Sequence, residues 1–142
     1  MERLRQAIPE DESQIYQLIL DLEELNIDRR HFINTYISNL NKPDVYYWVY
    51  EKDNEILGFI SIHIQKLLHH AGNIAEIQEF IVTGNSRNCG IGSRLFQKAK
   101  EVSQQNNCLQ LEVCCNQKRL SSHRFYQSQE MTNNHYKFCL HL

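Results

Sequence analysis

A stretch rich in Gly, Asn and Ser, between a predicted strand and a predicted helix, most constrains this chain. Residues 74–82 are largely apolar and β-branched, which favours a strand, and residues 91–105 repeat apolar side chains at helical spacing. A loop that opens a helix leaves several backbone amides unpaired, and the helix dipole adds partial positive charge there. Gly90 and Gly92 let this backbone approach an anion closely. The sequence therefore predicts an α/β chain with a phosphate-binding loop.

The loop matches neither of two common nucleotide-binding motifs. A Walker loop requires a lysine after its last glycine, and no lysine follows Gly92. A dinucleotide fingerprint requires a third glycine where this chain has Leu95. ATP and NAD are therefore disfavoured, while Arg87 and Arg94 add guanidinium groups suited to another phosphate ligand. Taken alone, the two glycines are equally compatible with a turn that binds nothing.

The remaining chain reads as strands and helices of a single domain, residues 1–142, without repeats or linkers. A capping box at Asp11 and Gln14 predicts the first helix, whose apolar positions extend to Leu25. Asp28 is predicted to cap a second helix, and Asp53-Asn54 to form a turn. Further strands are predicted at residues 3–8, 45–50, 56–64, 109–114 and 136–142, and a last helix at 119–128. In strand 56–64, alternation places Ile60, Ile62 and Ile64 on one face and Phe59, Ser61 and His63 on the other.

Charge and composition exclude several classes of partner. Lys and Arg number 15 against 17 Asp and Glu, so a net charge of −2 offers no general attraction to nucleic acid or anionic membranes. No apolar stretch is long enough for a signal peptide or a membrane span, so a cytoplasmic protein is expected. The five cysteines are expected to be reduced, and Cys114 and Cys115 would point to opposite faces of a strand. Zinc binding by these cysteines is therefore not expected and no metal ligand is assigned, although His63, His69 and His70 leave metal binding open.

A family resemblance rests on the loop together with a later helix. Val82, Arg87, Gly90 and Gly92 stand in the order V-x-x-x-x-R-x-x-G-x-G, and the predicted final helix contains Phe125-Tyr126. This combination resembles the GCN5-related N-acetyltransferase (GNAT) family over nearly the whole chain. Stretches at residues 68–70, 76–79, 116–126 and the loop itself look most like the aminoalkylphosphonate N-acetyltransferases.

The resemblance implies a single-domain α/β (α+β) fold that uses acetyl-CoA as co-substrate. Its sheet would be mixed but mostly antiparallel, with six or seven strands, about four flanking helices and two splayed strands that form the acetyl-CoA cleft. The residues expected to bind acetyl-CoA are Phe80, Ile81, Val82, Arg87, Asn88, Cys89, Gly90, Ile91, Gly92, Ser93, Arg94 and Asn116. Two positions depart from the family pattern. Glu130 stands where many members have the glycine that ends the helix, and Arg119 stands where an Asn often contacts the cofactor.

Amide formation from a thioester requires a base for the amine and an acid for the departing thiol. Glu76 is the first candidate base, because family members often carry a glutamate at this distance before the loop valine, and Glu79 is the second. Regular alternation would separate them, with Gln78, Phe80 and Val82 on the face of Glu76, and Ile77 and Ile81 on that of Glu79. One β-bulge would exchange these faces, and a structural ion pair is the open alternative for each glutamate. Tyr126 is the candidate acid, with a packed core tyrosine as its alternative.

The acceptor is expected to be the primary amine of a small molecule, attacked directly in a ternary complex. Ser61, His63, His69 and His70 are the candidate substrate-binding residues, and the resemblance makes an aminoalkylphosphonate attractive. An aminoglycoside, a polyamine or a protein amine remains an alternative acceptor, and a non-catalytic CoA sensor is the alternative class. No nucleic-acid or membrane partner is expected, and a homodimer is left open.

Overall fold

The computed structural model describes residues 1–23 and 26–142, apart from the side chain of Glu23. The described chain forms two compact units, Met1–Glu112 and Val113–Leu142. Leu25, predicted to lie in the first helix, falls outside the described residues. None of the described helices is long and apolar enough to span a bilayer.

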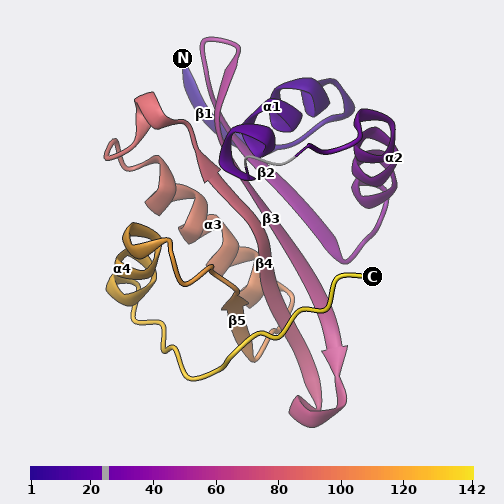
Figure 1. Cartoon of the computed structure of the whole chain (residues 1–142), viewed down its shortest axis with the longest axis vertical. Coiled ribbons are helices and arrows are strands. Elements are labelled where there is room, and N and C mark those ends of the chain that lie inside the picture. Colours follow the sequence, from indigo (N-terminus) through magenta and orange to yellow (C-terminus); the bar gives the residue numbers. More distant parts are fainter. Residues whose placement is uncertain (24–25) are drawn as a thin grey trace. The chain divides into compact units, whose positions relative to one another are not determined.

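A five-stranded sheet, in the order β1-β2-β3-β4-β5, forms the centre of the first unit. The strands are β1 (Glu2–Gln6), β2 (Val45–Lys52), β3 (Glu55–Leu67), β4 (Gly72–Val82) and β5 (Gln110–Val113). The first four strands pair in antiparallel order along the chain. A helix connects β4 to β5, whose arrows point the same way in Figure 1, so the sheet is mixed as expected.

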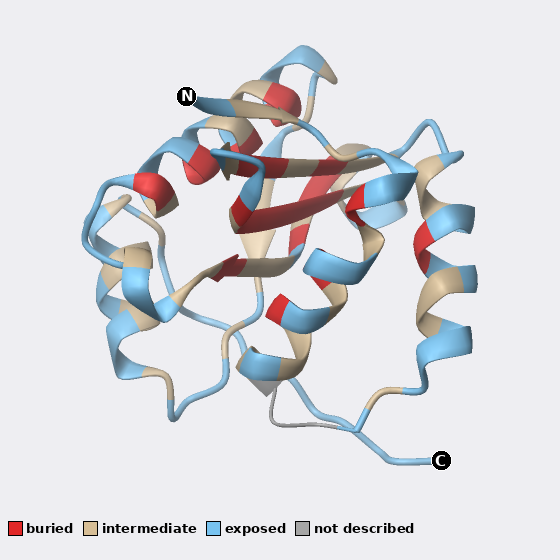
Figure 2. Ribbon diagram, turned by 90° about the horizontal axis from the view of Figure 1, so that it is seen from above, coloured by how far each residue is buried: buried red, intermediate tan, exposed pale blue. Residues whose placement is uncertain are grey.

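Three helices cover the two faces of this sheet. α1 (Glu12–Glu23) and α2 (Arg29–Leu40) lie on one face, and α3 (Ile91–Gln105) lies on the other (Figure 1). Asp28 caps α2 as predicted, because its Oδ2 accepts a hydrogen bond from His31 N at 2.9 Å. Buried residues gather on the strands and on the helix sides turned toward them (Figure 2). On the α1 and α2 face, the buried core comprises Ile15, Leu18, Tyr36, Tyr47, Val49, Ile56, Phe59 and Ile81.

Two local features position the long strand β3: a tight turn that joins it to β2, and a glycine where it contacts α3. Asp53 and Asn54 have φ angles of 51° and 65°, which suit a two-residue hairpin turn between β2 and β3. Gly58 on β3 lies directly beneath α3, and a Cβ built there would sit only 2.8 Å from Leu95 Cδ1. The close approach of helix to sheet therefore depends on a glycine at this position.

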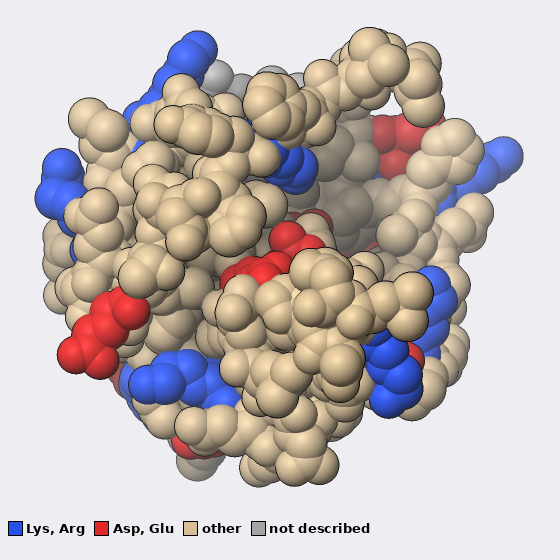
Figure 3. Space-filling model, turned by 90° about the horizontal axis from the view of Figure 1, so that it is seen from below, with Lys and Arg blue, Asp and Glu red and all other residues tan. Residues whose placement is uncertain are grey.

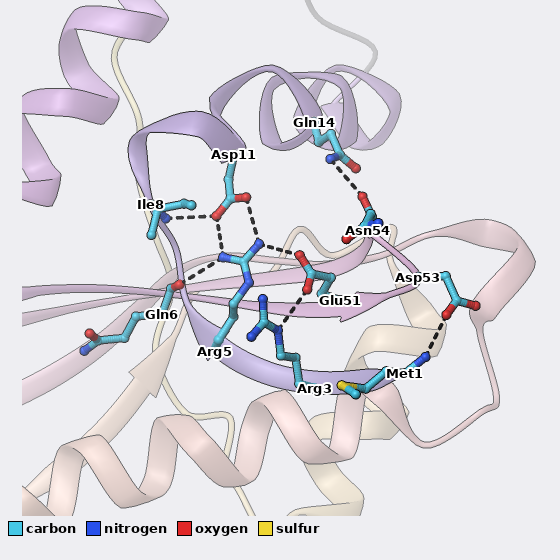
Figure 4. Close-up of polar contacts among 10 residues, drawn as sticks. All are labelled: Met1, Arg3, Arg5, Gln6, Ile8, Asp11, Gln14, Glu51, Asp53 and Asn54. Atoms are coloured by element: carbon cyan, nitrogen blue, oxygen red, sulfur yellow. Dashed lines mark hydrogen bonds and ion pairs between the residues drawn. The ribbon is translucent and has the colours of Figure 1, made fainter.

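An ionic clamp, formed by Arg5, Asp11 and Glu51, ties β1 to β2 and to the turn before α1 (Figure 4). The Arg5 guanidinium donates to Asp11 at 2.7 and 2.9 Å and to Glu51 at 2.7 Å. Arg5 holds the pKa of the Glu51 carboxyl below its usual value, with help from Arg3. Asp11 Oδ2 also accepts a hydrogen bond from Ile8 N, so its carboxylate points toward residues that precede it in the chain. Asp11 thus makes a capping-box contact, but as the third residue of a box that begins at Ile8 and not as the predicted partner of Gln14, and its carboxylate also serves the clamp.

The second unit contains α4 (Leu120–Ser128) and a C-terminal segment without strand or helix, residues 131–142. Glu130 takes the left-handed conformation, with φ 65°, where many family members have glycine. The predicted strand at residues 136–142 is wrong, and the part of the chain that the structure describes has a sheet of five strands rather than six or seven. Tyr136, Phe138 and Leu140 are 82%, 93% and 84% exposed, so their alternation has no packed surface to stabilise a strand.

Candidate functional site

A β-bulge in β4 arranges the candidate acidic residues. Ile60 pairs with Phe80 and Ile62 pairs with Ile77, so two residues of β4, Gln78 and Glu79, lie opposite Ser61 alone. The extra residue reverses the alternation of side chains along the strand.

The bulge places both glutamates on the sheet face covered by α1 and α2. Glu76 pairs with His63, and Glu79 bonds to Ser61 on the same face. Ile77 instead pairs with Ile62, on the face toward α3, where Phe80 stacks on Phe96. The predicted grouping of Glu76 with Phe80 and Val82, and of Glu79 with Ile77, is therefore wrong. The two glutamates share one face, which regular alternation could not produce.

Ser61 and Glu79 make two mutual hydrogen bonds across the bulge. Ser61 Oγ donates to Glu79 Oε1 at 2.5 Å and accepts from Glu79 N at 2.8 Å. The Ser61 side chain is fully buried, with 0% exposure, so it faces Glu79 rather than solvent. Gln78 Nε2 donates to Glu76 Oε1 at 2.9 Å, which links the other carboxylate to the same bulge.

A pocket of about 360 Å³ opens on this face, between the α1–α2 pair and strands β2, β3 and β4. The described residues that line it are Ile15, Ile19, Ile27, Phe32, Thr35, Tyr36, Asn39, Tyr47, Phe59, His63, Gln78 and Glu79. Among them, Glu79 carries the only carboxylate, and none is Lys or Arg. The pocket, called the acceptor pocket below, therefore combines apolar and aromatic walls with one acidic group, which suits a small amine.

A tyrosine hydroxyl from β2 forms part of the wall of the acceptor pocket. Tyr47 Oη accepts a hydrogen bond from Asn39 Nδ2 at 2.7 Å, which joins β2 to α2. Burial raises the pKa of the Tyr47 phenol, and the charge of Glu79 adds to that effect. Tyr47 therefore stays neutral and keeps its hydroxyl hydrogen. Sequence reasoning missed Tyr47, Asn39 and Thr35, since no local motif connects residues of α2 and β2 to the site.

The loop before α3 has the geometry expected of an anion-binding backbone. Gly90 caps α3 with φ 81°, and Asn88 also has a positive φ of 65°. The first helical hydrogen bond runs from Arg94 N to Gly90 O at 3.1 Å, so the amides of residues 91–93 lie ahead of it. A Cβ at Gly90 would meet no atom within 4 Å, which leaves open space beside this backbone. The glycine loop, residues 83–93, thus has the open backbone geometry of an anion-binding loop.

The side chains around the glycine loop differ in exposure and in the contacts they already make. Arg87 and Cys89 are exposed, and Cys89 Sγ lies 3.7 Å from Arg87 O. The Arg94 guanidinium instead lies over the Tyr50 ring, 5.0 Å from its centroid, and donates to Tyr50 Oη at 3.1 Å. Arg87 is therefore the better placed of the two arginines for a phosphate ligand. Phe80 and Val82 on β4 lie 3.8 Å from a Cβ built at Gly92, so the strand and the loop are in close contact.

The second unit contains the candidate acid. Tyr126 lies on α4, and its ring packs edge-to-face on Phe125 with centroids 5.7 Å apart. Burial raises the pKa of the Tyr126 phenol to about 12, with a further contribution from Cys115 and an opposing one from Arg119. Asn116 accepts hydrogen bonds from Lys118 N at 2.9 Å and Arg119 N at 3.0 Å, which shape the turn before α4.

The candidate histidines do not gather at one place. His63 lines the acceptor pocket, whereas His69 and His70 lie in the turn Leu68–His70 between β3 and β4. Their two rings are 4.3 Å apart, and neither ring is among the described lining of the pocket. On the face shown in Figure 3, basic and acidic side chains are interspersed among the described residues, without a continuous basic patch.

Comparisons with known proteins agree with this geometry. The model of the acetyltransferase (GNAT) family matches residues 6–131. An aminoalkylphosphonate N-acetyltransferase of Salmonella typhimurium is 37% identical over 135 residues, covering 95% of this chain and 88% of the relative.

Solved structures match the fold over nearly the full length. A transcriptional regulator from Bacillus halodurans superposes with a TM-score of 0.92 at 19% identity, covering 100% of both chains. A predicted acetyltransferase with acetyl-CoA from Clostridium acetobutylicum gives a TM-score of 0.82 at 18% identity, covering 99% of this chain and 96% of that one. At these identities the structures establish the fold alone.

Proposed function

The chain belongs to the acetyltransferase (GNAT) family and is an acetyl-CoA-dependent N-acetyltransferase, and on that premise we propose that it acetylates a primary amine of a small molecule. The observation that carries the proposal is the Glu79 carboxylate, the only one among the described residues that line the acceptor pocket, on the strand that leads into the glycine loop. An aminoalkylphosphonate is the first candidate acceptor, because the Salmonella relative carries that name.

The glycine loop and strand β4 are the proposed binding site for acetyl-CoA. The amides at the start of α3, together with Arg87, would hold the diphosphate, and the backbone of Phe80, Ile81 and Val82 would pair with the pantetheine arm. Acetyl-CoA supplies a thioester carbonyl that an amine can attack. Asn88, Cys89 and Ser93 complete the loop, and Asn116 is a further proposed contact from the second unit.

Glu79 is the proposed base. An alkylammonium is mostly protonated at neutral pH, so its proton must leave before the nitrogen can form the new C–N bond. Glu79 takes this proton directly or through one water, and the neutral nitrogen attacks the thioester carbonyl to form the C–N bond. The C–S bond then breaks, and the nitrogen gives its second proton to solvent. Glu76 becomes the second candidate, because its carboxylate bonds to Gln78 and it is absent from the described pocket lining.

Tyr126 is proposed to act on the leaving thiolate. With its pKa at about 12, the phenol remains neutral and can donate a hydrogen bond. Full proton transfer to a thiolate whose conjugate acid has a pKa of about 8.5 would be unfavourable. Tyr126 therefore stabilises the sulfur by a hydrogen bond, and the thiolate takes its proton from solvent.

The Tyr126→Phe variant tests this role. We expect kcat to fall about 10- to 100-fold, since one hydrogen-bond donor to the departing sulfur is lost. The affinity for acetyl-CoA, measured by calorimetry, should stay within twofold of the parent. Unchanged turnover by Tyr126→Phe would remove Tyr126 from the mechanism.

Binding and turnover together test the function itself. Saturating CoA should raise the thermal midpoint of the protein, whereas NAD and ATP at equal concentration should not. Thiol release from acetyl-CoA should then require an aminoalkylphosphonate, and the matching hydroxyalkylphosphonate serves as the amine-free control. If CoA stabilises the protein but the aminoalkylphosphonate releases no more thiol than the hydroxyalkylphosphonate, the proposed acceptor is wrong.

A cationic amine without an acidic group is the second candidate acceptor. It is favoured by the charge of the acceptor pocket, where Glu79 is the only carboxylate among described lining residues and Lys and Arg are missing from them. A phosphonate would have to find a Lys or Arg partner outside the described lining, inside which His63 supplies a ring N–H donor. Comparing kcat/KM for an aminoalkylphosphonate and for a polyamine or aminoglycoside decides between the two.

A further inference from the structure

Ser61 on β3 replaces a backbone hydrogen bond that the β4 bulge removes. Because Gln78 and Glu79 both face one residue of β3, one backbone amide of β4 loses its regular strand partner. A backbone amide that loses its strand partner costs free energy unless another acceptor replaces the lost hydrogen bond. Ser61 Oγ accepts from Glu79 N at 2.8 Å and so provides the missing partner.

The same hydroxyl also orients the Glu79 side chain. A serine hydroxyl has one hydrogen to donate and two lone pairs. Since the Glu79 amide occupies a lone pair, the hydroxyl hydrogen is directed to Glu79 Oε1, 2.5 Å away. Hydrogen bonds to an ionised acceptor are the short and strong class, so the carboxylate is held in one orientation.

We propose that Ser61 is the positioning residue for Glu79: it locks the β4 bulge and fixes one carboxylate oxygen so that the other serves the acceptor amine. This inference rests on the proposed role of Glu79 as base. Ser61 is fully buried, so it acts through Glu79 and not by binding the substrate itself. A preorganised base needs less reorganisation when the amine loses its proton.

Kinetics of single and double variants test the proposal. Ser61→Ala should lower kcat about 10-fold while KM for acetyl-CoA stays within twofold, because the base loses its orientation but the glycine loop is untouched. In a Glu79→Gln background, adding Ser61→Ala should change kcat by less than twofold, since Ser61 then has no base to position. Losses that multiply in the double variant would overturn the proposal.

A matched control separates positioning from general loss of a buried hydroxyl. Ser103 on α3 is also buried, at 5% exposure, and its Oγ donates to Ala99 O at 2.7 Å within the helix. Ser103→Ala removes a comparable hydroxyl away from Glu79, so kcat should remain at the parent value. A tenfold loss in Ser103→Ala as well would show that the Ser61 effect is structural and overturn the proposal.

Amide exchange provides a readout that does not depend on turnover. In Ser61→Ala, the Glu79 amide should exchange at least about 10-fold faster while other β4 amides keep their protection. If the exchange rate of the Glu79 amide did not change, the proposal that Ser61 holds the bulge would be contradicted, even if activity fell. If Glu79→Gln retains full activity, the base assignment fails, while the exchange experiment still decides whether Ser61 locks the bulge.

Discussion

The glycine loop and the acceptor pocket are built from different parts of the chain. The loop occupies residues 83–93 and presents backbone amides at the start of one helix. The pocket takes its walls from α1, α2, β2, β3 and β4, and the only carboxylate among its described lining residues comes from a bulge. A site made of contiguous backbone should be sensitive to charge and chain geometry, whereas a site made of side chains should depend on single functional groups.

The largest expected effect lies in the acceptor pocket. Glu79→Gln keeps the size of the side chain and its ability to accept from Ser61, but removes the base. We expect kcat to fall about 100-fold or more, with KM for acetyl-CoA nearly unchanged. Steady-state kinetics at pH 7, with each substrate varied in turn, measure both constants.

Glu76→Gln is the matched control, because Glu76 shares the sheet face but is not among the described pocket lining. Its kcat should stay within threefold of the parent value. If Glu76→Gln loses more activity than Glu79→Gln, the two glutamates exchange roles, and the pocket loses its assigned base.

The second largest effect is expected for a variant of the glycine loop, and it should change the binding of acetyl-CoA alone. Gly92→Asp places a negative charge in the first turn of α3, where it would repel the diphosphate of acetyl-CoA. We expect KM for acetyl-CoA to rise roughly 30- to 100-fold, with kcat at saturation within a few-fold of the parent. The same charge favours the helix dipole, so the unliganded protein should be as stable as the parent or more stable by up to about 1 kcal/mol.

Gly92→Ala separates charge from bulk at this position. A Cβ at Gly92 would lie 3.8 Å from Phe80 Cζ and Val82 Cγ2, which is ordinary contact, so alanine should fold normally. Its KM for acetyl-CoA should change far less than that of Gly92→Asp. Equal affinity of the Asp variant and the parent for acetyl-CoA would refute the diphosphate site.

The two regions also differ in how far the sequence predicts them. The span of α3, the cap at Asp28 and the turn at Asp53-Asn54 follow from local patterns and match the structure. The shared face of Glu76 and Glu79 does not, because a bulge depends on strand pairing that no local pattern encodes. Likewise, the alternation of Tyr136, Phe138 and Leu140 predicts a strand, but these side chains remain exposed. Local chemistry is thus readable from sequence, whereas contacts between distant segments are not.

The smallest expected effect on catalysis comes from the packing beneath the glycine loop. Alanine at Gly58 would put a Cβ 2.8 Å from Leu95 Cδ1 and 3.1 Å from Ile91 Cγ2, and both of these side chains are buried. We expect Gly58→Ala to lower the free energy of unfolding by about 1–3 kcal/mol, measured by urea denaturation. Because Ile91 begins α3, the displaced helix start should raise KM for acetyl-CoA a few-fold and leave kcat unchanged.

Gly84→Ala is the control, since a Cβ there meets no atom within 4 Å and should change the free energy of unfolding little. A fall in kcat of Gly58→Ala at saturating acetyl-CoA would show instead that the glycine loop and the acceptor pocket are coupled through β3, and that they do not respond independently.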